Sequence, residues 1–303
     1  MNNVYDCLVI GAGPSGIGAS IKLHKDGYKV AMIEKGTPGG KVNIAPRVDN
    51  YPGFKEILGP DLAIALFERV MNEGVEFIGD EITSLTKEKD LFVLKGLSDT
   101  YYSKTVYIAS GTVERKVGLP KEDELFGHGL SYCALCDGHF FKGQDVLVIG
   151  GGNAALKEAI HLSHIVKHLY VIHRRNEFRG SAKLVEELKE MDNVSILTPY
   201  IPVEFLEEDG KLTGVKIQNK ETEEIKTLVV QGVFPLVGQD PNTQFVKLDI
   251  LDERGNIPVE KNMMTRVSGA FAGGDVLPRD IRQIYLAEHD GNVAASNIEE
   301  YLK

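Results

Sequence analysis

The chain has 303 residues, which is room for two compact domains because single hydrophobic cores rarely grow beyond about 250–300 residues. Its 34 basic and 44 acidic residues give a formal net charge of −10, which argues against binding nucleic acid or an anionic membrane. No apolar run reaches the roughly 18 residues of a membrane span, and the N-terminal residues lack a signal-peptide pattern. The sequence therefore predicts a cytoplasmic globular protein.

The first third of the chain opens with a βαβ pattern. An apolar strand over 6–10 leads into Gly11-Ala12-Gly13-Pro14-Ser15-Gly16, a helix over 17–25 and a second strand over 28–33. In such a turn the first glycine bends the chain, the second admits a pyrophosphate and the third lets the helix pack closely on the strand. Glu34 ends the second strand, where an acid accepts hydrogen bonds from ribose hydroxyls. The context favours a nucleotide site over a glycine turn without a ligand.

A second βαβ pattern follows in the middle of the chain. A strand over 144–149 precedes Gly150-Gly151-Gly152-Asn153-Ala154-Ala155, a helix over 153–163 and a strand over 169–172. The basic residues His173, Arg174, Arg175 and Arg179 come where the first unit has its acid. Arginine grips a phosphate with two parallel hydrogen bonds, so this unit is predicted to prefer NADPH to NADH. The alternative is a solvated basic face at a helix start.

Two of the three cysteines form the pair Cys133-Ala134-Leu135-Cys136, directly before the second glycine motif. A thiolate near a helix start has a lowered pKa and reacts readily, so the pair is predicted to be redox-active. A zinc site would need two more ligands, for which only the flanking His128 and His139 are at hand. Asp137 is predicted to transfer protons during thiol exchange, or alternatively to cap a helix.

A weaker motif lies near the end of the chain. Residues 271–276 combine an apolar strand end with Gly273-Gly274-Asp275, a turn suited to a flavin pyrophosphate but common elsewhere. Between the two βαβ units, β-rich stretches occur at 91–94 and 105–109, and a final helix is predicted over 281–301. Taken together, the elements predict an α/β protein.

The four motifs, in this order, closely resemble the low-molecular-weight thioredoxin reductases, a class of flavin-dependent pyridine nucleotide-disulfide oxidoreductases. Further matching stretches are Pro38-Gly39-Gly40, Val48-Asp49-Asn50-Tyr51-Pro52-Gly53, Ala109-Ser110-Gly111-Thr112, Val237-Gly238-Gln239-Asp240-Pro241-Asn242-Thr243 and Arg282-Gln283-Ile284. The resemblance implies two Rossmann-like dinucleotide-binding domains of the three-layer ββα type. An FAD domain would comprise 1–113 and 240–303, and an inserted NADPH domain carrying the cysteine pair would comprise 114–239. Short hinges are expected near 112–116 and 238–241.

The same resemblance carries cofactor contacts over to this chain by position, and no metal is implied. For FAD the residues are Gly11, Gly13, Pro14, Ser15, Gly16, Glu34, Lys35, Gly40, Lys41, Asn50, Gly111, Gly274, Asp275, Arg282, Gln283 and Ile284. For NADPH they are Gly152, Asn153, Ala154, His173, Arg174, Arg175, Arg179 and Gly238.

The mechanism that the resemblance implies passes electrons from NADPH to FAD, then to the Cys133–Cys136 disulfide, and finally to thioredoxin. Cys136 would face the flavin, Cys133 would attack thioredoxin, and Asp137 would handle protons. The final helix, starting near Arg282-Gln283, would point its positive end at the flavin, and the protein would be a homodimer. Two alternatives remain: a flavin dithiol oxidoreductase using ferredoxin or a small dithiol, and a non-catalytic FAD/NADPH redox sensor.

Several positions depart from the pattern of the family. Lys41 stands where glutamine is usual, Leu135 replaces a common threonine, and the last helix carries Tyr285, Glu288 and His289 instead of small residues. These changes are expected to alter the reduction potential of the flavin or the choice of electron donor, whereas the arginines at 174, 175 and 179 favour NADPH as the donor.

Overall fold

The computed structural model describes residues 4–45, 47–279 and 281–303. The chain divides into two compact units, one of Met1–Val113 with Asp240–Lys303 and one of Glu114–Gln239. The chain passes from one unit to the other in β7 (Thr112–Glu114) and β15 (Gln239–Pro241), which pair with each other. The two segments predicted as hinges contain these strands.

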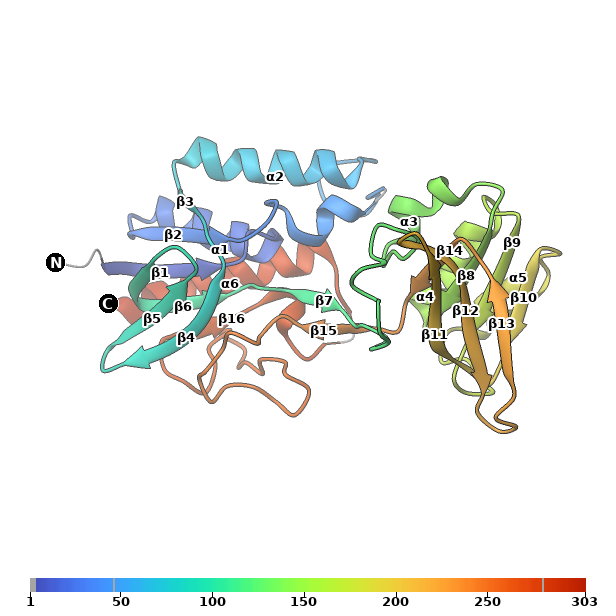
Figure 1. Ribbon diagram of the computed structural model, residues 1–303. Coiled ribbons are helices and arrows are strands. Elements are labelled where there is room, and N and C mark those ends of the chain that lie inside the picture. The colour runs from blue at the N-terminus through green and yellow to red at the C-terminus, as the bar shows by residue number, and fades with distance from the viewer. Residues whose placement is uncertain (1–3, 46, 280) are drawn as a thin grey trace. The chain divides into compact units, whose positions relative to one another are not determined.

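The first unit is built on a seven-stranded sheet with the order β3-β2-β1-β6-β5-β4, in which β16 also pairs with β6 (Figure 1). Strands β3, β2, β1, β6 and β16 run parallel, and β4 and β5 are antiparallel additions at the edge. Parallel strands are covered on both faces, which explains why the glycine motif follows an almost continuous apolar run. The strands are β1 (Val4–Ile10), β2 (Val30–Glu34), β3 (Glu76–Gly79), β4 (Ile82–Glu88), β5 (Leu91–Gly96), β6 (Thr100–Ile108) and β16 (Ala270–Ala272).

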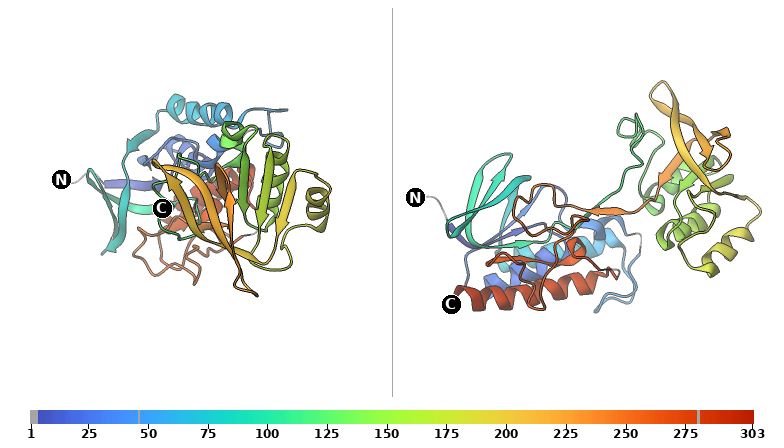
Figure 2. Two further views of the ribbon diagram at one scale, coloured as in Figure 1. Left: turned by 45° about the vertical axis from the view of Figure 1, so that its right-hand side comes forward. Right: turned by 90° about the horizontal axis from the view of Figure 1, so that it is seen from below.

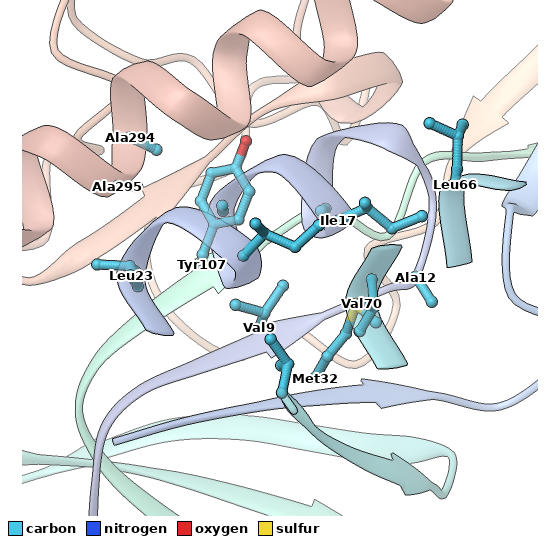
Figure 3. Packing of buried hydrophobic residues seen from close by; sticks show 14 of the residues in the cluster. Val9, Ala12, Ile17, Leu23, Met32, Leu66, Val70, Tyr107, Ala294 and Ala295 are labelled. Atoms are coloured by element: carbon cyan, nitrogen blue, oxygen red, sulfur yellow. The ribbon is translucent and has the colours of Figure 1, made fainter. Parts of the chain in front are cut away.

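Helices cover one face of this sheet. They are α1 (Pro14–Lys25), α2 (Gly59–Glu73) and α6 (Ile284–Leu302), with the short turn η1 (Gly40–Ile44). The short turn η3 (Gly274–Val276) precedes α6, and its Val276 packs on the opposite face of the sheet. Figure 3 shows Ile17 of α1 facing Val9 and Met32 of the sheet, and Ala294 of α6 on the other side of α1. These side chains belong to one buried cluster, so α1 is held between the sheet and α6.

The opposite face of the same sheet carries a second buried cluster. It joins alternate side chains of the central strands, such as Leu8 and Ile33, to Leu85 and Phe92 of the antiparallel strands and to the segment 245–277. Because side chains alternate across a strand, one apolar run supplies both clusters. The first unit therefore has three layers.

The second unit repeats this layering around a four-stranded parallel sheet with the order β10-β9-β8-β14. Val148 of β8 faces the helices, while the next residue, Ile149, faces the antiparallel strands β11–β13, which form the opposite layer (Figure 2). The strands are β8 (Asp145–Ile149), β9 (His168–Ile172), β10 (Val194–Leu197), β14 (Gly232–Pro235), β11 (Tyr200–Glu208), β12 (Lys211–Asn219) and β13 (Ile225–Val229). The helices are α4 (Asn153–Ser163), α5 (Ala182–Lys189), α3 (Ala134–Asp137) and the short turn η2 (Gly138–Phe141).

The structure confirms the α/β class and both βαβ units, with some shifted boundaries. The helix predicted over 17–25 starts at Pro14, because proline fits the first turn, where its missing N–H is not needed. The helix predicted from 281 starts at Ile284, because the backbone of Gln283 is extended. The sequence patterns do not predict helices α2 and α5 or the β11–β13 sheet. Within the described ranges, no helix is both long and apolar enough to cross a membrane.

Candidate functional site

A cavity of about 390 Å³ opens in the first unit, beside the chain segments that follow β1, β2 and β6 and precede α6. Ends of parallel strands around a glycine turn are where α/β proteins bind nucleotides. Residues lining it are Gly13, Pro14, Ser15, Glu34, Gly40, Lys41, Val42, Ala45, Ala109, Ser110, Gly111, Thr112, Gly274, Asp275, Arg282, Gln283, Ile284 and Ala287. Twelve of the sixteen residues expected at FAD are among them.

A second cavity of about 270 Å³ shares Glu34 and Ser110 with the first, so the two adjoin. It contains two more of the expected residues, Gly11 and Lys35. Its other lining residues are Ile10, Ile33, Asp80, Glu81, Ile82, Thr83, Asn242, Gln244 and Phe245. Sequence reasoning assigned no role to Asp80, Glu81, Gln244 and Phe245 in this wall, because the β3–β4 turn and the distant loop that carry them have no glycine motif.

Gly13 and Gly16 of the glycine turn after β1 have different surroundings. A Cβ atom added to Gly13, the N-cap of α1, would meet no protein atom within 4 Å, so this position opens into the cavity. A Cβ atom added to Gly16 would collide with the carbonyl oxygen of Gly11, so this glycine serves close packing and does not line the cavity. The free amides at the start of α1 suit a pyrophosphate.

The carboxylate of Glu34 is fixed at the junction of the two cavities. One oxygen accepts a hydrogen bond from the amide of Ala12 at 2.8 Å, and the other accepts one from the amide of Gly36 at 2.8 Å. Each carboxylate oxygen keeps a further lone pair, so the group can still accept from ribose hydroxyls.

The far wall of the first cavity rests on buried polar contacts that the sequence did not reveal. Asp290 of α6 accepts hydrogen bonds from the amide of Gly274 at 2.8 Å and from Arg279 at 2.6 Å, which fixes the turn containing Asp275. Asn50 donates to the side chain of Gln283 at 2.8 Å, immediately before α6. Asn50 does not line the cavity itself but holds a residue that does.

Ser15 shares a hydrogen bond of 2.6 Å with Tyr107, whose ring lies in the core between α1 and α6 (Figure 3). Burial raises the pKa of Tyr107 far above its ordinary value, so this hydroxyl stays neutral. The contact anchors the first turn of α1 to β6.

In the second unit, the loop after β9 folds back over the glycine turn. The amides of Arg179 and Gly180 donate to the carbonyl of Gly151 at 2.9 and 3.0 Å. Asn153 accepts from the amide of Ser181 at 2.7 Å. This loop carries three exposed arginines, at 174, 175 and 179, whose charges act on the neighbouring His173.

His173 differs from the arginines in being buried. Its ring stacks on Phe178 at a centroid distance of 5.3 Å and lies where a side chain on Gly151 would collide with it. Burial, and then the charges of the nearby arginines, with Arg179 foremost, lower its pKa, so the ring is neutral at physiological pH. In this arrangement the ring of His173 packs directly against Gly151 of the glycine turn, and its contact with a cofactor stays a prediction.

Cys133 and Cys136 form a disulfide at the start of α3. Cys133 is the N-cap residue, and its sulfur accepts a hydrogen bond from the amide of Cys136 at 3.1 Å. The buried hydroxyl of Ser131 accepts from the amide of Cys133 at 3.1 Å and donates to Asp137 at 2.5 Å. Ser131, which sequence reasoning missed, thus joins the first cysteine to the predicted acid–base group.

The structure shows the surroundings of Asp137 and His139, the two residues for which the sequence left a capping role and a zinc site open. Asp137 is the last residue of α3 and makes no capping hydrogen bond with its side chain to η2, so the capping role is not observed. The sulfur atoms of Cys133 and Cys136 are bonded to each other. The ring of His139 is edge-on to the ring of His161, with 6.4 Å between the ring centroids. Among the described residues, no three histidine, cysteine or acidic side chains are grouped to hold a metal ion.

Comparison with known proteins extends these observations to the whole chain. The profile of the family described as pyridine nucleotide-disulphide oxidoreductase matches residues 5–291. A thioredoxin reductase of Bacillus subtilis is 36% identical over 99% of this chain and 95% of the relative, and one of Mycoplasma pneumoniae is 38% identical over 99% and 96%. The crystal structure of Lactococcus lactis thioredoxin reductase, in its FR conformation, matches with a TM-score of 0.88 and 34% identity, over 98% of this chain and 99% of that one.

Proposed function

Because the chain belongs to the pyridine nucleotide-disulphide oxidoreductase family, we propose that it reduces the disulfide of thioredoxin with electrons from NADPH. The relatives and the solved structure confirm the predicted resemblance to thioredoxin reductases. The observation that carries the proposal is the Cys133–Cys136 disulfide, held at a helix start in a chain with two glycine-turn nucleotide motifs. Thioredoxin is the acceptor proposed by similarity to these relatives.

The unit of 1–113 and 240–303 is proposed to hold FAD, whose residues in the adjoining cavities fit that group. Gly13 and the start of α1 would face the pyrophosphate, and Glu34 would accept from a ribose. Arg282 and Gln283, directly before α6, line the same cavity and would lie at the ring end. When bound, FAD supplies two-electron transfer between a nicotinamide and a disulfide.

The unit of 114–239 is proposed to hold NADPH. Its glycine turn leaves Gly152 open, because an added Cβ atom there would meet no protein atom within 4 Å. The exposed guanidinium groups at 174, 175 and 179 are suited to a 2′-phosphate, which NADH lacks. This cluster favours NADPH over ferredoxin as the electron donor.

The chemistry of the cysteine pair follows from thiol–disulfide exchange. Once the pair is reduced, the Cys133 thiolate attacks one sulfur of the partner disulfide and expels the other as a thiolate. The Cys136 thiolate then attacks the sulfur of Cys133, restoring the disulfide and releasing the partner as a dithiol after it gains two protons. Asp137, held by Ser131, would transfer these protons, and Cys136 would be the cysteine that faces the flavin.

Three further features belong to the same proposal. The inserted unit would turn about β7 and β15, so that the cysteines serve the flavin and the partner alternately. The protein would act as a homodimer in the cytoplasm, a reducing compartment that suits a chain with one redox-active cysteine pair and one buried free thiol, Cys7.

Anaerobic mixing of the FAD-loaded protein with NADPH and then thioredoxin tests the proposal. Flavin bleaching followed by turnover supports it, and Cys133→Ser should abolish turnover while leaving bleaching intact. Bleaching without turnover would instead indicate a redox sensor or a small dithiol acceptor. Absence of bleaching with NADPH, together with bleaching by reduced ferredoxin, would indicate the other donor.

A further inference from the structure

Glu158 is an acidic residue to which none of the four sequence motifs assigns a role. It lies on α4 and is half-buried, and one carboxylate oxygen accepts a hydrogen bond from the amide of Ala134 at 2.9 Å. Ala134 is the first residue of α3 and the direct chain neighbour of Cys133. The side chain therefore links the helix that follows the second glycine turn to the segment that carries the disulfide.

Two acceptors share the amides at the start of α3. The Ala134 amide is bound by Glu158, and the Cys136 amide is bound by the sulfur of Cys133 at 3.1 Å. After reduction, that sulfur can carry a full negative charge as a thiolate. Two negative charges would then sit against neighbouring amides of one helical turn, and each would disfavour the other.

The surroundings of Glu158 already disfavour its ionised form. Burial raises its pKa to about 7, the hydrogen bond from Ala134 lowers it, and the charge of Glu114 in β7 raises it. Charged or titratable side chains on the elements packed against α4 are Cys136 and Asp137 on α3, Asp145 on β8, His168 and Tyr170 on β9, and Lys183, Glu186, Glu187 and Lys189 on α5. Lys157 and His161 are its neighbours on α4 itself. Among the described residues, the charged group that shifts the pKa of Glu158 is Glu114.

We propose that Glu158 is a positioning residue that holds the start of α3 and takes up a proton when the Cys133–Cys136 disulfide is reduced. Two electrons from the reductant break the S–S bond, leaving a thiolate on Cys133 and, with one proton from solvent, a thiol on Cys136. A second proton then binds the carboxylate of Glu158, which offsets the new charge on Cys133. This inference rests on the redox role of the disulfide in the proposed function.

The proposal has a direct consequence for the ease of reduction. Where Glu158 is ionised, its charge opposes the Cys133 thiolate, so the disulfide is harder to reduce. Replacing the carboxylate by an amide in Glu158→Gln removes that charge but keeps an oxygen that accepts from Ala134. The variant should therefore be easier to reduce at alkaline pH and resemble the wild type at acidic pH, where Glu158 is protonated anyway.

The test is an equilibrium redox titration of the full-length, FAD-loaded protein in dithiothreitol buffers, with alkylation of Cys133 and Cys136 read by mass. At about pH 8.5, Glu158→Gln should shift the dithiol–disulfide equilibrium about tenfold toward the dithiol, or about 30 mV for two electrons. At about pH 6 the two proteins should agree, since both are then neutral at this position. Glu187→Gln, an exposed neutral substitution on α5, is the matched control.

Three results would overturn the proposal: no shift in Glu158→Gln, a shift of the same size at every pH, or an equal shift in the Glu187 control. Glu158→Ala separates position from charge, since it also removes the acceptor for Ala134. Glu158→Ala should show the same alkaline shift as Glu158→Gln and, in addition, a pH-independent change in the dithiol–disulfide equilibrium. This second change should be absent from Glu158→Gln, which keeps the acceptor for Ala134. Dithiothreitol replaces both NADPH and thioredoxin here, so the outcome is independent of whether the protein turns over with those two molecules.

Discussion

The stability of Glu158→Gln provides a second and separate measure of the state of this carboxyl group. In the folded protein its pKa is about 7, above the ordinary value of 4.5, because burial disfavours the charge. The folded state therefore binds more protons than the unfolded chain between these two values, and the free energy of unfolding falls as the pH rises through them. At pH values well above 7 the free energy of unfolding is lower than at pH values below 4.5 by about 3 kcal/mol from this group.

Glu158→Gln lacks this titration and keeps an oxygen that accepts from the Ala134 amide. We expect the variant to be more stable than the wild type at about pH 8.5. The gap, meaning the free energy of unfolding of the variant minus that of the wild type, should grow by about 2–3 kcal/mol between about pH 5 and pH 8.5. Urea unfolding of the oxidised full-length protein, followed by circular dichroism at both pH values, measures the gap. The Glu187→Gln control on α5 should show no such pH dependence.

The reasoning would be refuted by a gap that does not change with pH, or by a variant that is less stable than the wild type at the higher pH. Either result would mean that the Glu158 carboxyl is ionised at little cost where it lies. The redox proposal would then lose its physical basis, although the proposed function would stand.

Three other predictions concern the nucleotide turns and the cysteine segment. Arg174→Ala with Arg175→Ala should lower the preference for NADPH over NADH by about 100-fold, because each charged hydrogen bond is worth about 1.5–3 kcal/mol, and an unchanged ratio of kcat/KM values would contradict the assignment. Gly13→Ala should change the free energy of unfolding of the apoprotein by less than about 0.5 kcal/mol but weaken the retention of FAD. Gly16→Ala should lower the free energy of unfolding of the apoprotein by about 1–3 kcal/mol, because the added Cβ atom meets a carbonyl oxygen. Similar unfolding curves for the two variants would refute this difference. Ser131→Ala should slow thioredoxin reduction about tenfold or more by releasing Asp137, while flavin bleaching by NADPH stays unchanged, and parallel losses in both steps would argue against that role.

Matched variants separate these effects from general damage. Lys183→Ala removes an exposed cation from α5, outside the arginine loop, and should leave the nucleotide preference unchanged. Ser131→Thr keeps a hydroxyl and should recover thioredoxin reduction in part, which a purely packing role for the serine would not explain.

The sequence by itself determined the parts of this protein that depend on local backbone geometry. A glycine turn between a strand and a helix is a property of a few consecutive residues, so both nucleotide turns and the ends of α4 could be predicted from the sequence. The same holds for the short spacing of Cys133 and Cys136, which lets the two sulfurs meet within one turn. In each case the residues that act together are neighbours in the chain.

Only the tertiary structure decided which distant side chains support those motifs. Asp290 reaches the Gly274 turn from within α6, and Glu158 reaches Ala134 across 24 positions of sequence. In the sequence Glu158 is one more glutamate in an amphipathic helix, a residue type that most often faces water. Its burial, and therefore its pKa and its influence on the disulfide, depends on how α3 and α4 pack, since desolvation is a property of the whole surroundings and not of the residue.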